Sequence, residues 1–523
     1  MYDIIIKNGL IIDGTGEKMY RNDIGIRGDK IAKIGDLHGE AAELEVDAIG
    51  KAVCPGFVDV NNHSDTYWQL FLSPNLESLV YQGVTTIVGG NCGSSLAPLV
   101  NSKDIETIQK WADIKRVNVN WLRMKEFLAV LDEKHLPINF ATLTGHGTIR
   151  RGVLKDESRN MSTIEFEAAK RMLSDSMDEG SLGISTGLIY THARLAPTEE
   201  LVDLAKIVKK KNGVYTTHIR GEGNDLLESL EEAMKIAQES GVKLHISHLK
   251  AMGEKNWDKM KEAIAIIDHA HSIGIDVSFD VYPYTSTGSV LYTLLPAWVS
   301  EGGKRMMLYR LKDPTLRKEI AAEMISSEID WSKVEISISP LNKTLTRRKI
   351  TDIAESQGKS VEDAVIDMLI ACEGRIITTM EILNEDNVVM ALKHPLSFIS
   401  SNGSGYSVNH GASGEIVHPR NFGTFPKLFS QYVRYSNLFS WEEAVKKVTG
   451  APAAKFGIKN RGVLKEGNFS DIVIMDMDKI ESPASKENPY QYSKGIDYVF
   501  VNGKAILLDG QFTGAKNGLV VRH

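Results

Sequence analysis

The amino-acid sequence predicts an α/β fold in which eight parallel strands close into a (β/α)8 barrel of the TIM type. Three observations predict this fold. Helical patterns that end at a glycine recur before short apolar strands, eight such strand patterns occur, and they spread across most of the 523 residues. Regular alternation of helix and strand implies a parallel sheet. Eight parallel strands over roughly 400 residues favour a closed barrel over an open, doubly wound sheet.

The repeating unit is clearest between residues 138 and 280. Four amphipathic stretches in this region end at Gly180, Gly213, Gly241 and Gly274. Because glycine takes the left-handed conformation after a helix end at little cost, we expect each glycine to cap a helix and lead into a strand. The eight expected strands cover residues 57–61, 84–89, 138–144, 182–185, 214–218, 242–248, 275–280 and 396–401.

Two further regions do not fit the repeating unit. The segment between the seventh and eighth strands is longer than an ordinary crossover and contains a strand-like stretch at 332–340, so we predict an inserted subdomain at about 288–350, before the last barrel strand. Residues 1–54 and 455–523 instead show short alternating strands with Asn-Gly and Asp-Gly turns. We expect these two chain ends to form one small β-domain, beside a barrel at 55–454.

Composition points to a small-molecule partner in the cytoplasm. The net charge of −7 offers no basic surface for nucleic acid or anionic lipid. No run approaches the ~18 apolar residues of a membrane span, and the N-terminal segment lacks the pattern of a signal peptide. The three cysteines, Cys54, Cys92 and Cys372, are too few for a disulfide framework and fit a reducing compartment. The oligomeric state stays open.

Residues able to bind a metal follow three of the predicted strands. Cys92 follows the second strand, His218 ends the fifth and His248 ends the sixth. The carboxyl ends of barrel strands converge on one face, where such enzymes place their catalytic groups. A lone cysteine or histidine is more often structural, but three at three strand ends favour a metal site. One thiolate and two imidazoles leave a fourth position on zinc for water, which suits amide hydrolysis.

One further histidine is expected to be structural. His245 lies on the same strand as His248 but three positions earlier. An odd offset along a strand points two side chains to opposite faces. We therefore expect His245 to lie away from the metal site.

The chain resembles the N-acyl-D-amino-acid deacylases (D-aminoacylases) of the amidohydrolase superfamily over essentially its whole length. The matching motifs are PGFVDVNNHSD at 55–65, GGNCGSS at 89–95, GHGTIR at 145–150, GISTGLIY at 183–190, THIRGEG at 217–223, ISHLK at 246–250, DVYPY at 280–284, HPRNFGTFPK at 418–427 and GNFSDIVIMD at 467–476. So many motifs in one order are specific for this family.

The resemblance implies a ligand set and a substrate. It implies one tightly bound Zn²⁺ on Cys92, His218 and His248, in agreement with the strand-end argument. It also implies that Lys250, Tyr282 and Arg420 hold the carboxylate of an N-acyl amino acid, for which an ammonium and a guanidinium are suitable receptors. Arg220, which follows the fifth strand, is a further candidate for substrate binding.

Two positions depart from the family pattern. The family begins its barrel with His-x-His, where this chain has Asn61, Asn62 and His63, so His63 is the remaining candidate for a second metal position. The family carries an aspartate after the eighth strand, where this chain has Asn402. An amide cannot accept a proton near neutral pH, so Asn402 cannot be the general base expected at this catalytic position. Candidate replacements near strand ends are His63, Asp65, His146 and Glu222.

Three functional hypotheses remain at this point. The first is a metal-dependent hydrolase that cleaves the amide C–N bond of an N-acyl-D-amino acid or related N-acyl compound through a metal-bound water. The second is a non-hydrolytic metal-dependent enzyme of the isomerase or lyase type. The third is a ligand-binding pseudoenzyme. Asn61 and Asn402 are the reason for keeping the second and third.

Overall fold

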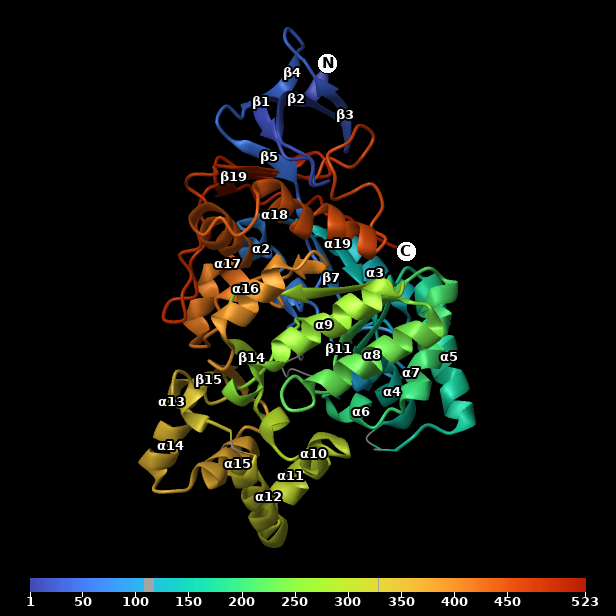
Figure 1. Ribbon diagram of the computed structural model, residues 1–523, viewed down its shortest axis with the longest axis vertical. Helices are drawn as coiled ribbons and strands as arrows, with labels where there is room; N and C mark the ends of the chain where they lie inside the picture. Colours follow the sequence, from blue (N-terminus) through green and yellow to red (C-terminus); the bar gives the residue numbers. More distant parts are fainter. Residues whose placement is uncertain (108–116, 156, 158, 328) are drawn as a thin grey trace.

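A computed structural model describes residues 1–107, 117–155, 157, 159–327 and 329–523. In these residues eight strand segments, all paired in parallel, form the barrel (Figure 1). Two neighbouring strands, β8 and β9, form one of these segments, interrupted at Leu143. A parallel bridge between Asn62 and Gly403 joins the last segment to the first and closes the ring. The segments are β6 (Phe57–Asp59), β7 (Val84–Gly89), β8 (Asn139–Thr142) with β9 (Thr144–Gly145), β10 (Gly183–Gly187), β11 (Val214–His218), β12 (Lys243–Ile246), β13 (Val277–Val281) and β17 (Ser397–Ile399).

Helices alternate with the strands and surround them, as the sequence predicts. In Figure 1 the helices α5, α7, α8 and α9 lie in a row on one side of the barrel. Outside the insertion the helices are α1 (Gln69–Leu72), α2 (Glu77–Val80), α3 (Met124–Lys134), α4 (His146–Leu154), α5 (Thr163–Asp178), α6 (Thr191–Arg194), α7 (Thr198–Lys210), α8 (Leu226–Ser240), α9 (Lys259–Ser272), α16 (Glu385–Lys393), α17 (Arg420–Lys427), α18 (Trp441–Val448) and α19 (Gly450–Lys455).

The predicted glycine caps differ in detail. Gly241 ends α8 in the left-handed region, with φ 68°. After α7 it is Asn212 that takes the left-handed conformation, with φ 53°, and Gly213 follows it. A Cβ at Gly213 would lie 2.9 Å from the backbone oxygen of Leu182, so the close approach of the chain just before β10 favours glycine here.

His245 points into the barrel, and the prediction that it lies on the face opposite His248 is wrong. Its Nε2 lies 3.0 Å from Oδ2 of Asp280, and its ring stacks on Phe398 at a centroid distance of 5.3 Å. The alternation rule does not apply because β12 ends at Ile246 and His248 has a φ of 42°, which turns the chain after the strand.

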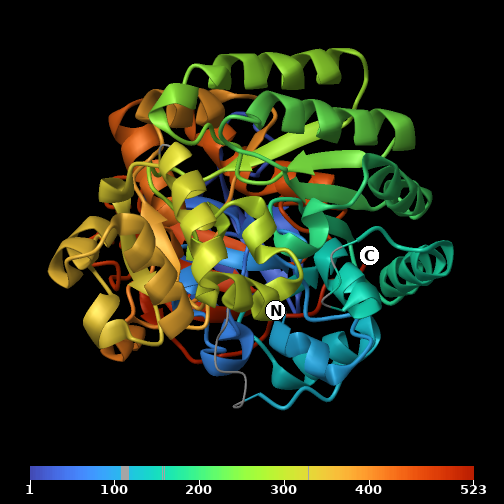
Figure 2. The ribbon, with the colours of Figure 1, turned by 90° about the horizontal axis from the view of Figure 1, so that it is seen from below.

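The insertion carries its own small sheet and core. Strands β14 (Thr287–Val290), β15 (Val334–Ile338) and β16 (Ile377–Met380) pair antiparallel. A separate apolar cluster runs from Leu291 to Met380, beyond the predicted end at 350. Viewed from below, the insertion lies across one end of the barrel (Figure 2). Its helices are α10 (Ala297–Ser300), α11 (Gly303–Lys312), α12 (Pro314–Ser326), α13 (Asn342–Leu345), α14 (Ile350–Gln357) and α15 (Val361–Ala371).

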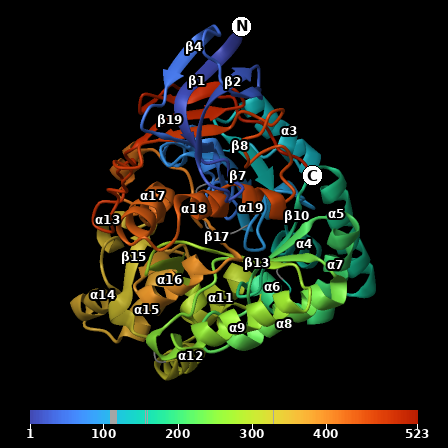
Figure 3. The same ribbon diagram turned by 45° about the horizontal axis from the view of Figure 1, so that its top comes forward.

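Both chain ends contribute to one sheet at the opposite end of the molecule (Figure 3). Strand β5 of the N-terminal segment pairs antiparallel with β18 of the C-terminal segment, which joins the two ends. The described strands are β1 (Tyr2–Ile11), β2 (Tyr20–Arg27), β3 (Lys30–Gly35), β4 (Ala42–Asp47), β5 (Ala52–Pro55), β18 (Ile472–Met475), β19 (Ile496–Val501), β20 (Lys504–Leu508) and β21 (Gln511–Phe512). Among the described residues we find no helix with the length and apolar character needed to span a membrane.

Candidate metal centre

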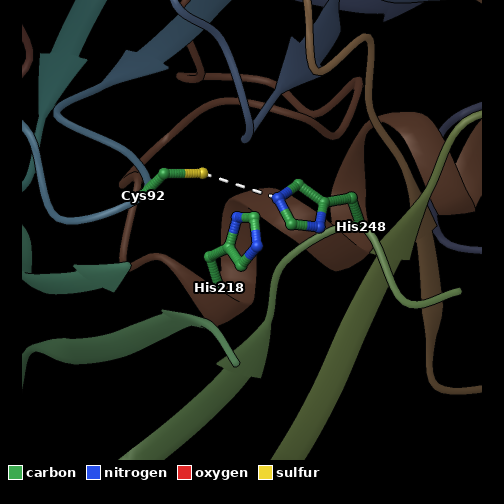
Figure 4. Close-up of side chains that lie close together, drawn as sticks. All are labelled: Cys92, His218 and His248. Atoms are coloured by element: carbon green, nitrogen blue, oxygen red, sulfur yellow. Dashed lines mark hydrogen bonds between the residues drawn. The ribbon is translucent and has the colours of Figure 1, made fainter. Parts of the chain in front are cut away.

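Cys92, His218 and His248 converge from the carboxyl ends of the second, fifth and sixth barrel segments, which are β7, β11 and β12 (Figure 4). One ligand atom from each lies within 4.8 Å of the others, and all three side chains are buried. Sγ of Cys92 lies 3.5 Å from Nε2 of His248, and the two imidazole rings meet edge to face at 4.4 Å. Cys92 and His248 both have positive φ, a strained conformation that aims their side chains at the cluster. This donor set fits zinc.

Glu222 and Lys250 contact His248 on the side opposite the nitrogen that faces Cys92. Oε1 of Glu222 lies 3.0 Å from Nδ1 of His248, so Nε2 is the nitrogen that faces Cys92. Lys250 Nζ contacts the same carboxylate oxygen and lies 2.9 Å from the His248 carbonyl oxygen. A histidine that binds a metal through Nε2 carries its proton on Nδ1 and donates it to such a carboxylate.

The charges around Glu222 keep it ionised. Burial alone raises the pKa of this carboxyl, but the Lys250 ammonium and the two imidazoles outweigh that effect and hold its pKa well below the usual range. Glu222 is therefore the anion that balances Lys250 beside the metal ligands.

The two asparagines that break the family pattern both make specific contacts. Asn402, with φ 43° after β17, lies with Oδ1 2.9 Å from Nε2 of His63. That nitrogen lies 3.9 Å from Sγ of Cys92, so His63 borders the metal cluster. Asn61 turns into the barrel, where its Nδ2 lies 3.3 Å from each carboxylate oxygen of Asp280.

The cluster lies in the wall of a cavity of about 690 Å³ between the barrel and the insertion. Arg420, the first residue of α17, is buried in the wall of the same cavity. Among the described residues its Nε and Nη1 have no hydrogen-bond partner, and the same holds for the hydroxyl of Tyr282. The guanidinium carbon lies 5.0 Å from the centre of the Tyr282 ring. A buried cation without a partner is costly, so this arrangement indicates that an anion binds here.

The comparison with known proteins agrees with this geometry. Residues 44–507 match the model of the amidohydrolase family. The chain belongs to the amidohydrolase family. The resemblance to D-aminoacylases is confirmed by a D-aminoacylase of Alcaligenes xylosoxydans xylosoxydans, which is 33% identical over 99% of this chain and 97% of that protein.

Two further members of this family are similar along their whole length. An N-acyl-D-glutamate deacylase of the same organism is 31% identical, over 96% of this chain and 93% of that protein. A crystal structure of N-acyl-D-glutamate deacylase from Bordetella bronchiseptica, complexed with zinc and a phosphonate inhibitor that mimics the tetrahedral intermediate, superposes with a TM-score of 0.84. It is 29% identical and covers 100% of both chains.

In this amidohydrolase two of the predicted catalytic candidates lie outside the cavity wall. Asp65 accepts the backbone N–H groups of Thr66 at 2.7 Å and Gly90 at 2.6 Å, so it holds the loop that carries Cys92. His146 begins α4 and lies 2.7 Å from a carboxylate oxygen of Glu200. These contacts do not fit the catalytic roles that their strand-end positions predicted.

Arg220 is bound by other groups of the chain. Its Nε and Nη2 lie 2.9 and 2.8 Å from the two carboxylate oxygens of Glu232, and it donates as well to the carbonyls of Arg194 and Ala196. It lines the cavity, and these contacts brace the segment after β11 and engage its guanidinium donors, so substrate binding by Arg220 stays a prediction.

Sequence reasoning missed two features of the site. Glu222 was considered only as a base, whereas its contact with Nδ1 of His248 gives it a positioning role. Tyr190 was not considered, although its ring lies 5.3 Å from that of His218 and it lines the cavity. The only signal for both was their place within the motifs THIRGEG and GISTGLIY.

Proposed function

We propose that this amidohydrolase cleaves the C–N amide bond of an N-acyl-D-amino acid and uses one zinc ion held by Cys92, His218 and His248. The observation that carries the proposal is that a buried cluster of one cysteine and two histidines shares one cavity with the buried guanidinium of Arg420, whose Nε and Nη1 lack hydrogen-bond partners among the described residues. Similar proteins named D-aminoacylase and N-acyl-D-glutamate deacylase support the substrate class. When bound, zinc supplies Lewis-acid activation of water and of the acyl carbonyl.

Arg420 and Tyr282 receive the carboxylate of the substrate. A guanidinium donates charge-assisted hydrogen bonds to a carboxylate, and Nε and Nη1 of Arg420 lack partners among the described residues. Lys250 is already engaged by Glu222 and His248, so it contributes positive charge near the substrate while it keeps the ligand His248 in place. Carboxylate binding at Arg420 fixes the amide bond beside the cluster.

His63 takes the proton of the attacking water at Nε2. Of the four candidate bases, only His63 and Glu222 line the cavity, and Glu222 is engaged by Lys250. Asn402 lies beside His63, with its Oδ1 2.9 Å from Nε2. With its oxygen towards Nε2 it accepts the hydrogen bond of the protonated ring.

The comparisons do not favour the two alternatives, an isomerase or lyase and a pseudoenzyme, because the similar proteins are named as deacylases. A cytoplasmic location is also part of this proposal. It is supported by the three cysteines, all described by the structure, which are buried and form no disulfide.

Release of free amine tests the proposed function. Zinc-loaded protein is incubated with N-acetyl-D-methionine, N-acetyl-D-leucine and their L enantiomers. We expect amine from the D compounds only, and loss of ~10²- to 10⁴-fold in kcat in His63→Ala with zinc content unchanged. Metal binding without amine from any of these compounds would contradict the proposal. Full activity in His63→Ala would contradict the assignment of the base.

A further inference from the structure

A second, smaller pocket of about 230 Å³ lies beside Cys92 and beneath helix α11 of the insertion. Its wall is formed by the loop after β7, the first turns of α4, the segment from β10 to α6, and the insertion. Cys92 and Tyr190 line both this pocket and the main cavity. The two spaces therefore adjoin at Cys92 and Tyr190.

The pocket lies on the side of the metal cluster that does not carry the carboxylate receptors. Arg420 and Lys250 line the main cavity, and none of Arg420, Lys250 and Tyr282 lines this pocket. In an N-acyl amino acid the carbonyl carbon separates the acyl chain from the part that bears the carboxylate. If the carboxylate lies at Arg420 and the carbonyl at Cys92, the acyl chain continues towards the pocket. This step rests on the proposed function.

The size of the pocket exceeds what an acetyl group requires. A volume of 230 Å³ corresponds to roughly seven or eight water molecules at about 30 Å³ each. The methyl group of an acetyl substrate would leave most of this space to solvent. The pocket has room for an acyl chain of about four to six non-hydrogen atoms.

The charged residues in the pocket wall indicate which group the acyl chain of the substrate carries at its end. Arg151 on α4 and Lys304 on α11 line the pocket, and no acidic side chain does so among the described residues. Arg151 is half-buried, and Lys304 is 44% exposed with Glu373 3.7 Å away. Burial, together with the nearby positive charge of Arg151, lowers the pKa of His192 to about 3, so this lining residue is neutral and the positive charge of the lining comes from Arg151 and Lys304.

We propose that this pocket is the acyl subsite and that it takes an acyl group longer than acetyl which ends in an anion. The substrate class is then the monoamide of a dicarboxylic acid with a D-amino acid, such as an N-succinyl or N-glutaryl compound. Hydrolysis adds water across the C–N bond and releases the dicarboxylate and the free amino acid. Arg151 is the residue that selects the terminal carboxylate.

Three acyl derivatives of one D-amino acid test this proposal with the zinc-loaded protein. They are the N-acetyl compound, the N-succinyl compound and the N-succinamoyl compound, which has the shape of the succinyl group without its charge. We expect kcat/KM to be about tenfold or more higher for the succinyl compound than for the succinamoyl compound. In Arg151→Gln the ratio of the two kcat/KM values should fall to about one while the zinc content stays as in the native protein. Arg305→Gln, on the exposed side of α11 and outside the pocket, is the matched control and should keep the native ratio.

Equal or faster turnover of the acetyl or succinamoyl compound would overturn the proposal, and so would a preference that survives in Arg151→Gln. If no compound releases amine, the proposed function has failed, and the binding of the same compounds by calorimetry then decides the role of the pocket. Tenfold tighter binding of the succinyl compound, lost in Arg151→Gln, supports an anion subsite. Equal binding of the succinyl and succinamoyl compounds excludes it.

Discussion

Replacing Glu222 with glutamine should weaken zinc binding without removing any zinc ligand. The carboxylate oxygen 3.0 Å from Nδ1 of His248 fixes the ring so that Nε2 faces Cys92. Glutamine keeps the shape but loses the charge that balances Lys250 and that draws the proton to Nδ1. Loss of such a partner costs ~10- to 100-fold in metal affinity. That range corresponds to roughly 1.4 to 2.8 kcal/mol of binding free energy.

The assay is a zinc titration of metal-free protein against a coloured chelator of known affinity. Glu232→Gln is the matched control, because this carboxylate is bound by Arg220 and is not a partner of the metal ligands. We expect the control to bind zinc as the native protein does and Glu222→Gln to bind it at least tenfold more weakly. Native affinity in Glu222→Gln would refute the argument that this carboxylate orients His248.

Three further predictions concern the metal, the base and the buried acids. Cys92→Ala should lose tight zinc binding and keep a native circular dichroism spectrum; unchanged zinc content would exclude Cys92 as a ligand. Asn402→Asp should raise deacylase activity, measured as amine release, because a carboxylate accepts a proton where an amide cannot; a fall would indicate that the native chemistry needs the amide. Burial raises the pKa of Asp59 to about 6 from an ordinary 3.8, so the folded protein retains a proton that the unfolded chain has lost between these values. Stability should therefore fall by about 3 kcal/mol as pH rises through that interval, and Asp59→Asn should flatten this fall in thermal midpoints measured from pH 4 to 7; an unchanged profile would contradict it.

The barrel was predictable from the sequence because helix ends and strands have local sequence patterns, such as a glycine after a helix and a short apolar run in a strand. The segment from 242 to 248 shows that such patterns do not fix where a strand ends. Its apolar pattern predicted a strand through His248, but the strand ends at Ile246 and the chain then turns at His248, which places both histidines on the inner side. The extent of the insertion was also not predictable, because its later helices α14 and α15 are assigned to it only by the apolar cluster into which they pack.

Position at the end of a barrel strand was enough to predict the metal-binding residues of the candidate site. That rule brought Cys92, His218 and His248 together, but it does not say where a side chain points. Asp65 turns back to the backbone N–H of Gly90, and His146 pairs with Glu200, which lies far away in the sequence. Long-range ion pairs of this kind depend on the packing of separate helices, and one sequence alone gives no sign of them.

Comparing zinc-loaded with zinc-stripped protein in one amine-release assay tests the central claim most directly. Metal content is measured in the same samples, with N-acetyl-D-methionine and the N-succinyl compound as substrates. We expect one zinc per chain, amine release that disappears with the zinc, and recovery when zinc is added back. Undiminished amine release after zinc removal, or a fully loaded protein that releases none from either substrate, would contradict it.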